Sequence, residues 1–327
     1  MEQSLLLSRV RVRDQTKRTT MRAFTLDSFG AQPGLRDDLF EPAPADDELL
    51  IRVNASSVNG VDVFIAAGAM KEMAEHEFPV TLGRDFAGVV AQVGSAVSRY
   101  RVGDEVFGFV LHANPTVHEG SWAELITVPE NISVAAKPRN AGFAEAGVAP
   151  LAAITALAAF DALAPAEGKN VLVVGATGGV GSFFVQLASD AGANLIAPAF
   201  AEDHDYLRGL GVGVFVERNG DVAAAVRQAH PDGVDGILDL VSQAPDASLL
   251  KEGGRLASPL GAAGEGAGRF NVMAQPTPAN LQRLAELLDS GTLRVSIQHS
   301  YGLEQAADAL EAFSTTHTVG KLSFAIA

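Results

Sequence analysis

A short apolar strand runs directly into a cluster of glycines and then into a helix in VLVVGATGGVGSFFVQLASDAG, residues 171–192. Branched apolar residues predict a buried strand over 171–174, and the apolar positions over 180–191 repeat with the spacing of one helix face. The turn between strand and helix contains four glycines, Gly175, Gly178, Gly179 and Gly181. So many glycines in one turn indicate that the backbone must adopt unusual angles or be approached closely by another group.

The order strand, glycine turn, helix is typical of sites that bind dinucleotides. In the pattern Ala176-x-Gly178-x-x-Gly181, Gly178 lets the backbone approach a pyrophosphate, and Gly181 lets the helix pack close to the strand. The free N–H groups at the helix start then face the phosphates. The alternative is a tight turn that binds nothing. The candidate cofactor-binding residues of this turn are Gly175, Thr177, Gly178, Gly179, Val180 and Gly181.

The chain divides into two regions that differ in their pattern of predicted strands and helices. Residues 21–140 consist of short alternating strands separated by Gly, Pro and Asp, which predicts a β-rich domain. From Pro150 onward, strand and helix patterns alternate, which predicts a mostly parallel sheet covered on both faces. The expected strands of that sheet are 171–174, 195–197, 214–216, 236–241, 255–258 and 270–273. The predicted fold class is therefore α/β.

Composition excludes several classes of function. The net charge of −15 argues against nucleic acid as a partner, because binding a phosphate backbone needs clustered cations. There is no cysteine, so disulfides, thiolate catalysis and Cys-ligated metals are excluded. No apolar run approaches the length of a membrane span. We expect a cytoplasmic protein, with residues 1–20 a disordered extension or an overlong start.

The sequence favours NADP over NAD as the dinucleotide. NAD-binding units usually carry an acid at the end of the second strand, where this chain has Ala197, Pro198 and Ala199. Arg218, at the end of the third strand, is placed to reach a 2′-phosphate, although it is equally compatible with a solvated surface position. Two nearby acids, Glu202 and Asp203, would repel a phosphate, so the preference for NADPH depends on Arg218.

Several segments together resemble the medium-chain dehydrogenase/reductase superfamily, in its zinc-free quinone oxidoreductase (zeta-crystallin-like) branch. They occur in the family's order and span almost everything after Met21. The segments are ASSVNGVDVFIAAG at 55–68, FPVTLGRDFAGVVAQVGSAVSRYRVGDEVFGF at 78–109, GSWAELITVP at 120–129, PLAAITALAAF at 150–160, VGATGGVGSFFVQLASDAGA at 174–193, GGRLASPLGAAGE at 253–265 and HTVGKLSF at 317–324.

The resemblance implies two domains with a cleft between them. Residues 21–149 and 292–327 would form a GroES-like catalytic domain, and residues 150–291 a Rossmann-type NADP-binding domain with a doubly wound parallel sheet. Zinc members have Gly-His-Glu where this chain has Gly83-Arg84-Asp85, and a guanidinium cannot ligate a cation. No metal site is expected, and the seven histidines read as surface or loop residues.

The resemblance also implies roles for residues near the reacting end of the cofactor. Asn59 matches an Asn near the nicotinamide and substrate, with loop capping as the alternative, and Asp62 is expected to hold the same loop. Phe64 stands where many relatives have a Tyr, so it offers stacking without a hydroxyl donor. Other positions that match the family's cofactor contacts are Thr155, Val241, Leu260 and Gly261.

We therefore expect an NADPH-dependent oxidoreductase that transfers hydride to a quinone or a similar conjugated carbonyl. An alkenal or enoyl reductase is the alternative enzyme, although Met70 stands near the position where enoyl reductases place a proton-donating Tyr. A low-turnover NADPH-binding protein with a structural or sensing role is a third possibility. The resemblance implies a homodimer.

Overall fold

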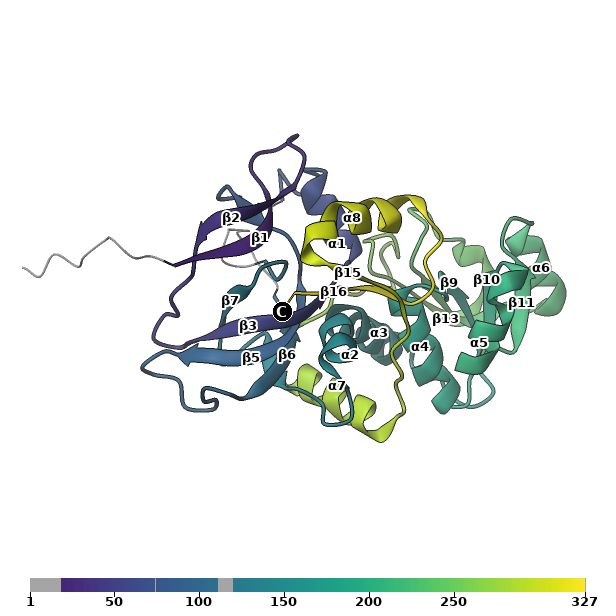
Figure 1. Cartoon of the computed structure of the whole chain (residues 1–327). Coiled ribbons are helices and arrows are strands. Elements are labelled where there is room, and N and C mark those ends of the chain that lie inside the picture. Colours follow the sequence, from purple (N-terminus) through teal and green to yellow (C-terminus); the bar gives the residue numbers. More distant parts are fainter. Residues whose placement is uncertain (1–18, 74, 111–119, 327) are drawn as a thin grey trace, which may run out of the picture.

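A computed structural model describes residues 19–73, 75–110 and 120–326. The extension expected over 1–20 lies outside the described residues up to position 18, and Thr20 already begins strand β1 (Thr20–Leu26). Figure 1 shows a β-rich unit built mainly from the first part of the chain, beside a unit in which helices flank a parallel sheet. This architecture confirms the predicted α/β fold class, with a GroES-like part and a Rossmann-type part.

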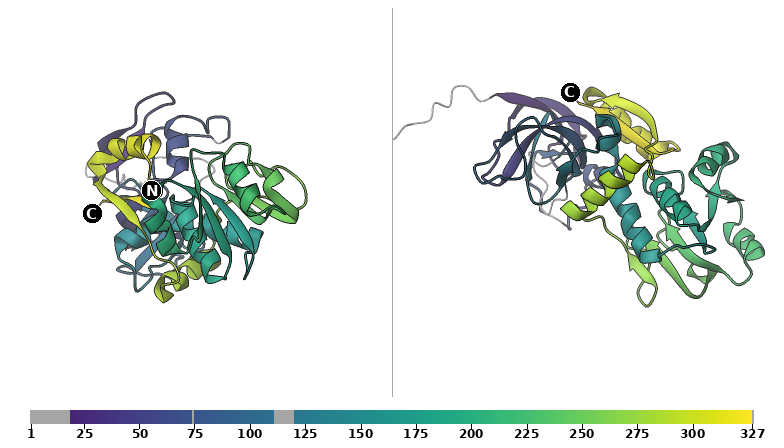
Figure 2. Two further views of the ribbon diagram at one scale, coloured as in Figure 1. Left: turned by 90° about the vertical axis from the view of Figure 1, so that its right-hand side faces the viewer. Right: turned by 90° about the horizontal axis from the view of Figure 1, so that it is seen from below.

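The β-rich unit contains two sheets. One has the order β2-β1-β4, and the other has the order β15-β16-β3-β5-β6-β8, with β7 paired to β3. The last strand of the chain, β16, lies antiparallel to β3, so the C-terminus completes a sheet started near the N-terminus (Figure 2). The strands are β2 (Gly34–Phe40), β3 (Glu48–Ser57), β4 (Val80–Thr81), β5 (Asp85–Val93), β6 (Glu105–Phe109), β7 (Leu125–Pro129), β8 (Val134–Ala136), β15 (Ile297–Gly302) and β16 (Lys321–Ala325).

The parallel sheet has the order β11-β10-β9-β12-β13-β14. The chain runs from the central β9 outward to one side and then returns to the other side, so the strand order reverses between β9 and β12. In such sheets, ligands bind beyond the carboxyl ends of the strands at this reversal. The strands are β9 (Asn170–Val174), β10 (Asn194–Ala199), β11 (Val214–Glu217), β12 (Val234–Asp239), β13 (Leu250–Ser258) and β14 (Arg269–Asn271).

Helices cover both faces of the parallel sheet, which explains why its strands read as continuous apolar runs. Val171 and Val173 belong to a core with α3 and α4, whereas Leu172 belongs to the core on the opposite face with α6. The helices are α1 (Gly60–Ala66), α2 (Phe143–Val148), α3 (Pro150–Leu163), α4 (Gly179–Asp190), α5 (His204–Leu210), α6 (Val222–Ala229), α7 (Pro278–Ser290) and α8 (Ala306–Thr315). Within the described residues, none of these helices is long and apolar enough to cross a membrane.

A buried aromatic group joins the C-terminal strand to the β-rich unit. Trp122, the only tryptophan of the chain, is fully buried, and its ring centroid lies 4.6 Å from that of Phe324 in β16. Its indole N–H donates to the carbonyl of Ser57 at 3.0 Å. The tail after α8 is thus part of the core of the β-rich unit.

We expect Phe324→Ala to lower the free energy of unfolding by about 3–5 kcal/mol, because it leaves a cavity beside Trp122. Trp122 fluorescence reports this site directly, so urea unfolding followed by its emission is the measurement. Val102→Ala, at an exposed valine, is the control and should cost under about 0.5 kcal/mol. A wild-type midpoint for Phe324→Ala would contradict the packing of the tail.

Candidate active site

The glycine turn connects β9 to α4. Gly175 has a φ of 91°, a left-handed conformation that favours glycine, and an added Cβ there would lie 3.0 Å from the Val241 side chain. Gly178 occupies the cap position before α4, so the first N–H groups of this helix point out of the turn. The turn also pairs with the tail, since the Gly320 N–H donates to the Thr177 carbonyl at 2.7 Å.

Two glycines of the turn have opposite surroundings. An added Cβ on Gly181 would collide with the Gly175 carbonyl and lie 2.7 Å from the Ala176 Cα. Among the described residues, an added Cβ on Gly178 would meet only the Gly175 carbonyl, at 3.6 Å. Gly181 is therefore required for helix–strand packing, whereas Gly178 has open space beside it. Binding of a pyrophosphate in that space stays a prediction.

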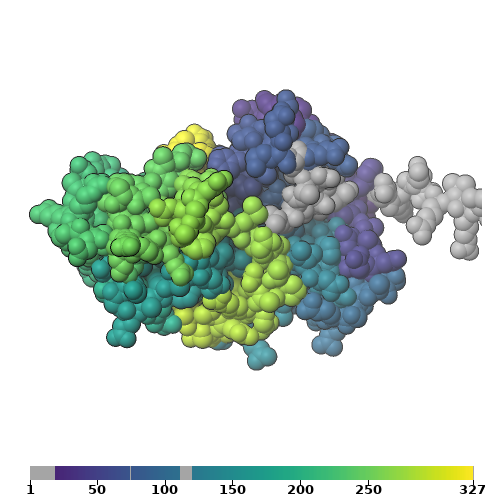
Figure 3. All heavy atoms as spheres, turned by 180° about the vertical axis from the view of Figure 1, so that it is seen from behind, coloured from purple at the N-terminus to yellow at the C-terminus, as the bar shows by residue number. Residues whose placement is uncertain are grey.

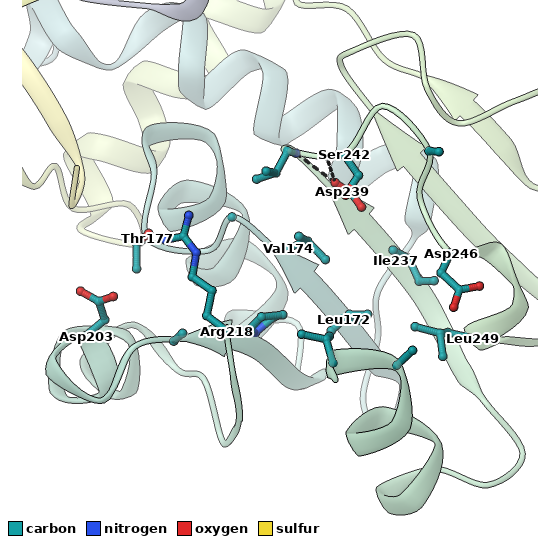
Figure 4. Close-up of a pocket in the computed structure, with 17 residues that line it drawn as sticks. Leu172, Val174, Thr177, Asp203, Arg218, Ile237, Asp239, Ser242, Asp246 and Leu249 are labelled. Carbon is teal, nitrogen blue, oxygen red and sulfur yellow. Dashed lines mark hydrogen bonds between the residues drawn. The ribbon is translucent and has the colours of Figure 1, made fainter. Parts of the chain in front are cut away.

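A cavity of about 340 Å³ opens at the carboxyl ends of β9, β10 and β12 (Figure 4). Among the residues that line it are four of the predicted cofactor contacts, namely Gly175, Thr177, Arg218 and Val241. The Asp239 carboxylate at the end of β12 accepts hydrogen bonds from the N–H groups of Val241 and Ser242, at 2.9 and 2.8 Å. The predicted strand 236–241 therefore ends at Asp239, because this carboxylate turns the chain into the loop that borders the cavity.

Arg218 lies at this cavity within a group of aromatic and ionisable side chains. Its guanidinium is 4.9 Å from the ring centroid of Phe200, and its Nη1 is 3.2 Å from Nδ1 of His317. The other imidazole nitrogen lies 2.9 Å from the buried Asp203 carboxylate. His317 is a loop residue, as the sequence suggests. It contacts both Arg218 and Asp203, one of the two acids that were expected to repel a phosphate.

Asn59 belongs to a buried polar group that we call the junction cluster: Ser57, Asn59, Asp85 and Lys321. The Asn59 amide donates to Asp85 Oδ2 at 2.9 Å, and its oxygen accepts from Lys321 Nζ at 2.6 Å. Asn59 is 7% exposed and occupies the N-cap position of α1, and both polar atoms of its side chain are hydrogen-bonded to side chains of this cluster. Burial lowers the pKa of Lys321, and the carboxylates of Asp85 and Asp62 oppose this effect.

Asp62 holds the loop that carries Asn59. Its carboxylate accepts from the N–H of Asn59 at 2.8 Å and from the N–H of Gly83 at 3.2 Å, and it is fully buried. Burial raises the pKa of Asp62 to about 7, and the nearby charge of Arg84 acts in the opposite direction. These contacts are the structural role expected for Asp62.

The remaining predicted residues lie around these groups. Phe64 projects from α1 and is 50% exposed, so its ring face is available to a ligand. Thr155 is buried in α3, where its hydroxyl donates to the Leu151 carbonyl at 2.7 Å. Leu260 and Gly261 follow β13. The predicted cofactor contacts that are not part of the cavity lining are Thr155, Gly178, Gly179, Val180, Gly181, Leu260 and Gly261.

Two family descriptions match the chain. "Alcohol dehydrogenase GroES-like domain" covers residues 45–139, and "Zinc-binding dehydrogenase" covers residues 210–322. The NADPH-dependent alkenal/one oxidoreductase of Arabidopsis thaliana is 31% identical over 311 residues, which is 92% of this chain and 78% of the relative. The quinone-oxidoreductase homolog of Spinacia oleracea is 37% identical over 176 residues, which is 52% of each chain.

A solved structure agrees with these matches. The quinone oxidoreductase from Coxiella burnetii superposes with a TM-score of 0.84 at 28% identity, covering 94% of this chain and 100% of that one. This chain belongs to the medium-chain dehydrogenase/reductase superfamily. The protein is an oxidoreductase of that superfamily.

The described residues include no group of three or more His, Asp or Glu side chains that could hold a metal ion. Arg84, at the superfamily's zinc-ligand position, is buried, and its charge acts on Asp62. The description "Zinc-binding dehydrogenase" covers residues 210–322 and does not include Arg84, whose guanidinium cannot bind zinc.

The junction cluster and the contact between His317 and Arg218 were not predicted from the sequence. The sequence indicates a buried partner for Lys321, because this residue is the lone charge at the start of the apolar strand KLSFAIA. Asp85 is likewise a charged residue directly before an apolar segment, FAGVV. Nothing in the sequence pairs these residues with each other.

We expect Gly178→Ala to weaken NADPH binding at least about tenfold while costing under about 1 kcal/mol of stability, the usual range for a cap position. Gly181→Ala should instead destabilise the fold by about 1–3 kcal/mol or more, because the added methyl meets backbone. Calorimetric titration with NADPH and thermal unfolding measure the two effects. Unchanged NADPH affinity in Gly178→Ala would contradict a pyrophosphate at this turn.

Asp62 should make stability depend on pH. Since the pKa of Asp62 is raised from 3.8 to about 7, the folded protein keeps a proton that the unfolded chain releases. Its contribution is complete below about pH 4 and is lost as pH rises to about 7. We expect the free energy of unfolding of Asp62→Asn to decline less over this range than that of wild type. Denaturant unfolding at pH 4.5, 5.5, 6.5 and 7.5 tests this, and parallel curves would contradict it.

Proposed function

We propose that this oxidoreductase transfers hydride from NADPH to a quinone or a similar conjugated acceptor, without zinc. The observation that carries the proposal is the open space at Gly178, next to a cavity at the strand ends that Arg218 borders. This arrangement fits a dinucleotide with its pyrophosphate at the glycine turn and its adenosine part in the cavity. In Figure 3 the parallel-sheet unit (green) and the β-rich unit (purple to blue) form two lobes, and we place the acceptor where they meet.

The residues of the chain bind and orient the reactants. When bound, NADPH supplies the hydride from C4 of its dihydronicotinamide. The glycine turn and the start of α4 hold the pyrophosphate, and the exposed ring of Phe64 offers a stacking surface for a flat acceptor. Asn59 lies near the reacting end, with its amide already bonded to Asp85 and Lys321.

The choice of acceptor follows from proton supply. Phe64 has no proton to give, and the Lys321 ammonium is buried and bonded to the Val58 and Asn59 oxygens. The proton that completes the reduction would then come from solvent. This suits a quinone, because its reduction gives a stabilised hydroquinone anion that does not need an acid in the site.

An alkenal or enoyl reductase is the second candidate, and the Arabidopsis relative is named for alkenal and alkenone substrates. A low-turnover NADPH-binding protein is the third. NADPH oxidation measured with 1,2-naphthoquinone, 2-alkenals and crotonyl thioesters separates them. Turnover only with alkenals would overturn the quinone proposal, and tight NADPH binding without turnover of any acceptor would favour the binding protein.

NADPH is proposed over NADH because of the contacts of Arg218. Within the described residues it contacts the Phe200 ring and the His317 imidazole rather than a carboxylate, so its charge is available to a 2′-phosphate. The nearby Asp203 carboxylate is hydrogen-bonded to His317. We include a homodimer in the proposal because of the superfamily resemblance, and a cytoplasmic location because the sequence analysis leads to that expectation. Light scattering after gel filtration tests the dimer.

We expect Arg218→Ala to weaken NADPH binding about 10- to 100-fold, the range for losing a hydrogen bond to a charged group, and to leave NADH binding nearly unchanged. Arg283→Ala, which breaks a surface pair with Asp161, is the control and should alter neither affinity. Titration of each variant with both nucleotides is the measurement. Equal losses for NADPH and NADH would remove Arg218 from the phosphate site.

A further inference from the structure

Lys321 is a buried cation at the junction of the two units. Its side chain is 5% exposed, and its Nζ donates to the Val58 carbonyl at 3.0 Å and to Asn59 Oδ1 at 2.6 Å. The same Nζ lies 3.6 Å from Asp85 Oδ2. The ammonium thus donates two hydrogen bonds to protein oxygens and lies within ion-pair distance of a buried carboxylate.

Asp85 connects this cation to the parallel-sheet unit. One carboxylate oxygen accepts the N–H of Leu151 in the first turn of α3, at 2.7 Å, where the helix dipole favours a negative charge. The other oxygen accepts from Ser57 at 2.6 Å and from Asn59 at 2.9 Å. The junction cluster therefore joins β3, β5, β16 and the start of α3 in one satisfied network.

The stem of Lys321 touches the cofactor turn. An added Cβ on Gly179 would lie 2.6 Å from the Lys321 Cδ, and the preceding Gly320 is hydrogen-bonded to Thr177. One end of the side chain lies against the glycine turn, and the other fixes the amide of Asn59. Lys321 thus connects the loop that leads to α1 and Phe64 with the glycine turn.

We propose that Lys321 is a positioning residue for hydride transfer: it sets the Asn59 loop, and with it the acceptor side of the site, against the nucleotide held by the glycine turn. The inference rests on the proposed function and extends it to a residue that touches neither reactant. A purely structural lysine would only balance the charge of Asp85. A positioning lysine must also supply the hydrogen bond to Asn59 Oδ1.

Two variants separate these roles. Lys321→Met keeps the stem beside Gly179 but leaves Asp85 uncompensated, so we expect lower thermal stability and a kcat reduced about 10- to 100-fold. Lys321→Met/Asp85→Asn removes both charges. We expect this double variant to recover most of the thermal stability while its kcat stays at least about tenfold below wild type, with an NADPH Kd within about threefold. Recovery of wild-type kcat in the double variant would overturn the proposal.

One further variant tests the proposal without changing Lys321, and another serves as a control. Asn59→Ala removes the acceptor of the Lys321 bond without changing any charge, and it should lower kcat by a similar factor. A wild-type kcat in Asn59→Ala would contradict the proposal even if both Lys321 variants failed to fold. Lys169→Met, at a half-exposed lysine paired with Asp235, is the matched control and should behave as wild type.

A readout without turnover distinguishes failure of this inference from failure of the proposed function. The fluorescence lifetime of bound NADPH reports how rigidly the dihydronicotinamide is held, and we expect it to shorten in Lys321→Met/Asp85→Asn and in Asn59→Ala. Absence of turnover in the wild type, with these shortened lifetimes, would contradict the quinone activity and support the positioning role. Unchanged lifetimes, or no NADPH binding at all, would overturn the inference.

Discussion

The buried carboxylate of Asp85 is the constraint on which the arrangement of the two units depends. A carboxylate removed from water is strongly unfavourable unless it is paired and hydrogen-bonded. Here its partners come from β3, from the loop before α1, from the start of α3 and from β16. The requirement to satisfy one charge therefore helps to specify how the β-rich unit, helix α3 and the C-terminal strand meet.

The glycine turn depends on the same junction. Its backbone is hydrogen-bonded to Gly320, and Gly179 leaves space for the stem of Lys321. A turn that borders the proposed nucleotide site on one side thus contacts the C-terminal tail on the other. Packing of the protein requires small residues at Gly179 and Gly181, and the proposed ligand site requires one at Gly178.

The sequence predicted those features that depend on local pattern. The parallel strands, the glycine turn and the α/β fold class follow from apolar runs and turn residues, and the structure confirms them. Some strand ends were wrong: β10 runs two residues longer than predicted, and β12 and β14 each end two residues early. Local chemistry explains the end of β12, since the Asp239 carboxylate accepts hydrogen bonds from the N–H groups that follow it. The roles of individual site residues stay predictions. The junction cluster was not predictable, because Asn59 and Lys321 lie 262 positions apart and only the folded chain brings them together.

The cofactor preference shows the same limit of sequence reasoning. In the sequence, Asp203 stands as an acid beside the expected phosphate site and argues against NADPH. In the structure, its carboxylate is buried and bonded to His317, which also contacts Arg218. The charge that meets a ligand is therefore set by three side chains from separate segments, rather than by the acid alone. Because His317 belongs to the same tail as Lys321, this one C-terminal segment contacts both the phosphate end of the proposed cofactor site and the loop that carries Asn59.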